Sequence, residues 1–129
     1  MTGKRPVVTP RLKTPANPYS LATRVGNQVF ISGQVAIDAE GQLVGKGDLV
    51  AQTRQVLENI KALVEAAGGN MDDIVKTTTF VTSMQDFAKT VPTRREYFHE
   101  PYPASTAVQV ARLVDPDWLI EIEATAVLP

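Results

Sequence analysis

The spacing of hydrophobic residues predicts one long amphipathic helix in the middle of the chain. Asp48 is a suitable N-cap, and Gly68-Gly69 ends the helix because glycine accepts a left-handed backbone there. Polar residues such as Gln52 and Lys61 fall largely outside the apolar stripe. The stripe recurs at steps of three and four residues and consists of Leu49, Thr53, Val56, Ile60, Leu63, Val64 and Ala67. This pattern is typical of a structural helix that packs on a core.

Alternating or continuous runs of β-forming residues predict strands on both sides of this helix. On the N-terminal side we expect strands over residues 18–25, 28–31 and 34–37, with Gly26-Asn27 as the first turn. Gly33 interrupts the run between the last two, which indicates a bulge or a close approach of another group to the backbone. On the C-terminal side, residues 74–82 are rich in threonine and valine and suit a central strand.

The end of the chain contains two further alternating stretches, residues 103–113 and 119–128. Asp115-Pro116-Asp117 breaks the pattern between them, so the sequence predicts a hairpin. The alternation places Ile120, Ile122, Ala124 and Ala126 on one face and Glu121, Glu123 and Thr125 on the other. We therefore expect an apolar core face and a small, polar face that carries two carboxylates. By the same alternation Ser105 lies opposite to Thr106 and Val108 and is expected on the small, polar face with Glu123.

These elements predict an α+β fold with the order β-β-β-α-β-α-β-β. The second helix is expected over residues 86–99, and Pro92 fits only its first turn, which makes Thr90 a candidate cap. We expect both helices on one face of a six-stranded sheet. Residues 1–17 contain three prolines and are predicted to form an irregular arm of this single domain, which spans residues 1–129.

Composition and charge exclude several classes of chemistry. The net charge is −1, from 13 basic and 14 acidic residues without a basic stripe, which argues against a nucleic-acid partner. The chain has no cysteine and a single histidine, His99, so thiolate nucleophiles and histidine metal clusters are excluded within one chain. No run reaches membrane length and the N-terminus lacks a signal-peptide pattern, so we expect a cytoplasmic protein with no membrane partner.

Several short motifs together resemble the Rid family of reactive-intermediate deaminases, also called YjgF-type or L-PSP endoribonuclease proteins. The resemblance covers nearly the whole chain. It implies a chorismate mutase-like mixed sheet, a homotrimer with sites in the clefts between subunits, and hydrolysis of a C=N bond without a cofactor. The motifs are Pro18-Tyr19, Ile31-Ser32-Gly33-Gln34, the helix segment from Ala51 to Ile60, Ile74-Val75-Lys76-Thr77-Thr78, Pro103-Ala104-Ser105-Thr106 and Ile120-Glu121-Ile122-Glu123-Ala124.

The resemblance also implies which residues form the site. Glu123 corresponds to the family's catalytic glutamate, which positions water or exchanges a proton with a substrate nitrogen. Ser105 stands where well-known imine deaminases have a substrate-clamping arginine, and its hydroxyl is expected to orient substrate instead. Tyr19, Ser32 and Gly33 are expected to bind substrate or shape the cleft. From the residues alone, Glu123 is more typical of a wet sheet face than of a catalytic site. Tyr19 fits a half-buried strand aromatic nearly as well, and Ser32 and Gly33 also fit an ordinary bulge.

Two functions from different classes follow. The first is an enamine or imine deaminase. Its expected partner is a small metabolite, which is an enamine, an imine or a keto acid. Ser105 predicts weak activity on simple 2-imino acids, because serine cannot replace the charge of arginine. The resemblance of Pro103-Ala104-Ser105-Thr106 to the motif of aminomuconate-type enamine deaminases implies that class of substrate instead. The alternative is a trimer that binds small metabolites, or acts as a chaperone or regulator, without turnover. A third interpretation, RNA cleavage, requires a positively charged groove.

Overall fold

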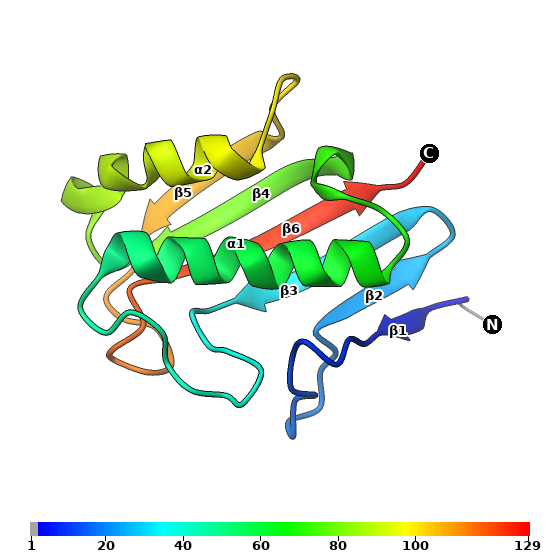
Figure 1. Cartoon of the computed structure of the whole chain (residues 1–129), viewed down its shortest axis with the longest axis horizontal. Coiled ribbons are helices and arrows are strands. Elements are labelled where there is room, and N and C mark those ends of the chain that lie inside the picture. The colour runs from blue at the N-terminus through cyan, green and yellow to red at the C-terminus, as the bar shows by residue number, and fades with distance from the viewer. Residues whose placement is uncertain (1–2) are drawn as a thin grey trace.

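The fold is a single mixed sheet with two helices on one face, as the sequence predicts (Figure 1). The structure is a computed structural model that describes residues 3–129. The helices are α1 (Leu49–Ala66) and α2 (Val91–Tyr97), with 3₁₀ helices at Met71–Asp73 and Met84–Thr90. The six strands are β1 (Arg5–Val7), β2 (Ala22–Val25), β3 (Gln28–Gln34), β4 (Ile74–Val81), β5 (Ala104–Gln109) and β6 (Ile120–Val127).

The spatial order of the strands differs from the predicted hairpin. The order is β1-β2-β3-β6-β4-β5, so β5 and β6 are not neighbours. β6 lies between β3 and β4 and is antiparallel to both, whereas β5 pairs in parallel with β4 at the edge of the sheet. Parallel neighbours need a crossover connection, and α2 supplies it between β4 and β5. The hairpin prediction was wrong because alternation determines the faces of a strand but not its partners.

The strands near the N-terminus also depart from the prediction. Within the arm predicted to be irregular, Arg5–Val7 forms β1, which pairs with β2 and buries Val7. Residues 1 and 2 of that arm lie outside the described residues. Of the predicted strand over 34–37 only Gln34 belongs to a strand, as the last residue of β3, and Ile37 makes an isolated bridge with Leu43. The predicted element order is nevertheless correct, since β1 takes the place of this strand.

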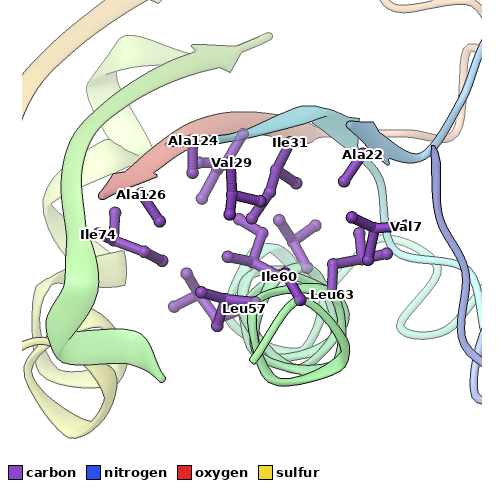
Figure 2. Packing of buried hydrophobic residues seen from close by; sticks show 14 of the residues in the cluster. Val7, Ala22, Val29, Ile31, Leu57, Ile60, Leu63, Ile74, Ala124 and Ala126 are labelled. Atoms are coloured by element: carbon purple, nitrogen blue, oxygen red, sulfur yellow. The ribbon is translucent and has the colours of Figure 1, made fainter. Parts of the chain in front are cut away.

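The long helix α1 holds the core together. Asp48 caps it, with its carboxylate accepting a hydrogen bond from the Ala51 backbone N–H at 3.0 Å. At the other end Gly68 has φ +98°, the left-handed conformation expected of it. Figure 2 shows Leu57, Ile60 and Leu63 of α1 directed at the apolar face of the sheet. The sheet contributes Val29, Ile31, Ala124 and Ala126 to this cluster.

Gln52 on α1 is buried, contrary to its predicted place outside the apolar stripe. Its side chain is 0% exposed. The amide nitrogen donates to the carbonyl oxygens of Gly45 at 3.1 Å and Asp117 at 3.0 Å, and the amide oxygen accepts from Leu119 N–H at 2.9 Å. Gln52 therefore joins the loops before α1 and β6, and its burial costs little because the polar groups are paired.

The second helix is shorter than predicted. α-Helical structure begins at Val91 with Thr90 as N-cap and Pro92 in the first turn. Figure 1 shows α2 lying along β4 and β5, while α1 lies nearer to β3 and β6.

Among residues 3–129, no helix is both long and apolar enough to cross a membrane.

Candidate functional site

Glu123 lies on the face of the sheet that carries neither helix, here called the open face. Along β6, Ile120, Ile122, Ala124 and Ala126 are buried against the helices, and Glu123 between them is exposed. Glu123 pairs across the sheet with Thr78 of β4. The predicted separation of apolar and carboxylate faces on this strand is confirmed.

Glu121 lies on the same face but is only half-exposed. Burial raises the pKa of the Glu121 carboxyl above its ordinary value, and the nearby charge of Glu123 raises it further. A Cβ atom added at Gly33 would lie 2.6 Å from Oε2 of Glu121. The close approach predicted at Gly33 is therefore present, and the approaching group is the Glu121 carboxylate. It occurs at a register shift between Ile31 and Gln34, the predicted bulge.

Ser32 and Tyr19 differ in what they offer to a ligand. The Ser32 backbone N–H and hydroxyl both donate to the Leu21 carbonyl oxygen, at 2.9 and 2.8 Å. The Ser32 N–H is therefore engaged within the chain, and Ser32 joins Leu21, just before β2, to the bulge. The expected contact of Ser32 with substrate stays a prediction. Tyr19 precedes β2 and is 55% exposed, so its ring is available for contact.

Ser105 lies on the opposite face of the sheet from Glu123. Residues that pair across neighbouring strands project to the same side. Ser105 pairs with Thr77, and Thr77 pairs with Ala124, both of which are buried on the helix side. Thr106, by contrast, pairs with Thr78 and so shares the face of Glu123. The expectation that Ser105 and Glu123 lie on one face was wrong, because the register of β5 comes from β4 and not from a hairpin with β6.

Ser105 opens into a cavity of about 210 Å³ between α2 and the edge of the sheet. The sheet contributes the hydroxyls of Thr77 and Thr79, and the loop before β5 contributes Tyr102. No acidic side chain lines the cavity, and its charged residues are Arg94 and Arg95 of α2. The full lining is Thr77, Thr79, Val91, Arg94, Arg95, Phe98, Tyr102, Pro103, Ser105 and Ile122.

Sequence reasoning missed Arg94. It is half-buried, its Nε donates to Thr90 Oγ1 at 3.0 Å, and its guanidinium carbon lies 4.6 Å from the Phe87 ring centroid. Burial lowers the pKa of Arg94 below its ordinary value, although a guanidinium stays charged in proteins. The sequence feature that could have identified Arg94 is its spacing from Phe87 and Thr90. Steps of three and four residues put all three on one side of a helical turn.

The site has no arrangement that suggests a metal ion. Among residues 3–129, no three histidine, cysteine, aspartate or glutamate side chains are grouped so that they could hold one.

Comparison with known proteins identifies the family. The family model described as Endoribonuclease L-PSP matches residues 10–128. The chain belongs to this family. The resemblance of the sequence to Rid proteins is thereby confirmed, and the relatives below carry Rid-family names.

Similarity to these Rid relatives extends over almost the entire chain. A RutC family protein of Pyrococcus horikoshii is 49% identical over 123 residues, which cover 95% of this chain and 97% of the relative. A 2-iminobutanoate/2-iminopropanoate deaminase of Salmonella typhimurium is 44% identical over 124 residues, which cover 94% of this chain and 95% of the relative. The crystal structure of RidA from an Antarctic Psychrobacter superimposes with a TM-score of 0.89 at 40% identity, covering 96% of this chain and 99% of that one.

The raised pKa of Glu121 predicts how stability depends on pH. A carboxyl whose folded pKa lies above its unfolded value favours the fold while it is protonated. This contribution is complete below the unfolded pKa of about 4.3 and is lost as the pH rises through the higher folded pKa. Glu121→Gln should therefore match the wild-type thermal midpoint near pH 4 and exceed it at pH 7, as measured by circular dichroism. A constant difference at both pH values would contradict this assignment.

Proposed function

We propose that this protein is an imine or enamine deaminase that hydrolyses a C=N bond to a carbonyl and ammonia. The observation that carries the proposal is the exposed Glu123 carboxylate on the open face, which takes part in no salt bridge among residues 3–129. A carboxylate in this state can accept a proton from water. The Salmonella relative that is named a 2-iminobutanoate/2-iminopropanoate deaminase supports the same chemistry.

The complete site is proposed to form between two copies of the chain in a homotrimer. Glu123 and Ser105 lie on opposite faces of one sheet, so one copy cannot direct both into a single cavity. In a cyclic trimer, the open face of one subunit can cover the α2 cavity of the next. The cavity volume of about 210 Å³ is below the roughly 300–1,000 Å³ of complete small-molecule sites, as expected for one half of a site.

The reaction then needs only water and the substrate. An enamine enters this sequence as its imine tautomer. Glu123 takes a proton from a water molecule as the water oxygen bonds to the imine carbon, and it passes that proton to the imine nitrogen to give a neutral carbinolamine. Glu123 then accepts the hydroxyl proton as the C=O bond forms and the C–N bond breaks, and it delivers this proton to the departing nitrogen, so that ammonia leaves and the carboxylate is restored. The Ser105 hydroxyl orients the substrate, and Tyr19 and Gly33 shape the cleft.

The substrate is proposed to be an aminomuconate-type enamine acid rather than a simple 2-imino acid. An arginine at position 105 would bind the carboxylate of a 2-imino acid through charge-assisted hydrogen bonds, worth about 1.5–3 kcal/mol. Ser105 provides no charge there. We therefore expect the imines of alanine and 2-aminobutyrate, generated in situ by an amino acid oxidase, to be hydrolysed about ten- to a hundredfold more slowly than by an arginine-bearing deaminase. Ammonia release measures this rate, and equal rates for the two enzymes would refute the proposed specificity.

A metabolite-binding trimer without turnover is the alternative. It predicts saturable binding of the carbonyl product but no ammonia release from any imine or enamine. Hydrolysis above the uncatalysed rate that depends on Glu123 would exclude this alternative.

A further inference from the structure

The α2 cavity has a positive wall in a protein whose net charge is −1. Arg94 and Arg95 are adjacent on α2, but their environments differ: Arg94 is half-buried and Arg95 is exposed. Facing them across the cavity are neutral groups of the sheet, the hydroxyls of Thr77, Thr79 and Ser105. The electrostatic character of the cavity therefore comes from the helix and not from β5.

The guanidinium of Arg94 donates one of its hydrogen bonds to another side chain among residues 3–129. An arginine has five N–H donors, and the Nε donor of Arg94 bonds to Thr90 Oγ1 at 3.0 Å. Among residues 3–129, Arg94 belongs to none of the salt bridges. Arg54 on α1, by contrast, makes a two-pronged contact with Glu96 at 3.0 and 2.9 Å.

The position of Arg94 is fixed before any ligand binds. Thr90 holds Nε, and the ring of Phe87 lies under the guanidinium at 4.6 Å. A cation that is partly removed from water without a counter-ion loses solvation. A ligand carboxylate would restore the missing charge partner through a fork of two hydrogen bonds.

We propose that Arg94 determines substrate specificity by binding a carboxylate that is remote from the reacting C=N carbon. This inference rests on the proposed deaminase function and assigns the substrate class to the same site, an imino or enamino acid with a second carboxylate several bonds from the nitrogen. Ser105 on the sheet and Arg94 on α2 belong to different walls of the cavity. A carboxylate at Arg94 is therefore displaced from the place where an arginine on β5 would hold one, and a longer acid can span the difference.

Binding of the carbonyl product class tests this assignment. We use 2-oxoadipate as the long dicarboxylate probe and 2-oxobutanoate as the short one, with dissociation constants measured by titration calorimetry on the full chain. Wild type should bind 2-oxoadipate more tightly than 2-oxobutanoate. Arg94→Gln should weaken 2-oxoadipate binding by about ten- to a hundredfold and change 2-oxobutanoate binding little. Arg94→Lys, which keeps the charge but not the fork, should recover part of the affinity.

The matched control is Lys89→Gln. It makes the same change in net charge close to α2, but Lys89 pairs with Asp86 at 3.0 Å and does not line the cavity. This variant should bind 2-oxoadipate as wild type does. Three results would each overturn the proposal: an equal loss of 2-oxoadipate affinity in Arg94→Gln and Lys89→Gln, wild-type affinity for 2-oxoadipate in Arg94→Gln, or no saturable binding of 2-oxoadipate to wild type.

Failure of this inference and failure of the proposed function are distinguishable. If turnover depends on Glu123 but 2-oxoadipate binding does not change in Arg94→Gln, the specificity assignment is wrong and the deaminase function stands. Binding that depends on Arg94, without hydrolysis of any imine or enamine, would leave the carboxylate site and remove the deaminase.

Discussion

Glu123→Gln is expected to lower the rate of imine or enamine hydrolysis by about 10²- to 10⁴-fold, the contribution of a positioned general base. The amide keeps the size of the side chain but cannot accept a proton from water. Because Glu123 is exposed and takes part in no core contact, folding and oligomeric state should not change. Ammonia release measures the loss, and light scattering checks the assembly.

Glu121→Gln is the matched comparison for this result. It changes the same chemical group on the same face of β6, two residues away, and should lower turnover by less than about tenfold if only Glu123 acts on water. A larger loss in Glu121→Gln than in Glu123→Gln would assign the base to the half-buried carboxylate over Gly33 and contradict our account.

Ser105→Trp is expected to abolish turnover by a different route. The indole would occupy much of the cavity of about 210 Å³ beside α2 and exclude the substrate. β5 is the edge strand and Ser105 is exposed, so the larger side chain should be accepted by the fold. Ser105→Ala, which removes one neutral hydrogen bond worth about 1 kcal/mol, should cost only about fivefold. Full activity in Ser105→Trp would show that the cavity is not part of the site.

Local periodicity was sufficient to predict much of the fold. The boundaries of α1, its cap at Asp48 and the faces of β6 follow from the spacing of residues that are close in sequence. The bulge at Gly33 was also predictable, because a glycine inside a strand pattern usually marks a bulge or a close approach to the backbone.

Features that depend on distant partners could not be predicted in this way. Alternation could not show that β6 pairs with β3 and β4, so Ser105 was placed on the wrong face. Gln52 is polar and was placed outside the stripe, yet it is buried at little cost because backbone groups pair with its amide, including those of Asp117 and Leu119 in the distant loop before β6. Arg94 is one of thirteen basic residues, and its place in the wall of the cavity depends on how α2 lies against β4 and β5.

We expect each site to combine the open face of one subunit with the α2 cavity of another. Mixing two inactive variants, Glu123→Gln and Ser105→Trp, tests it most directly. After equal amounts are refolded together, about a quarter of the interfaces in a trimer should unite an intact open face with an intact cavity. Ammonia release should then recover to about a quarter of the wild-type rate. If differently tagged subunits are shown to exchange and the mixture is still inactive, the two halves do not come from different subunits and the account is wrong.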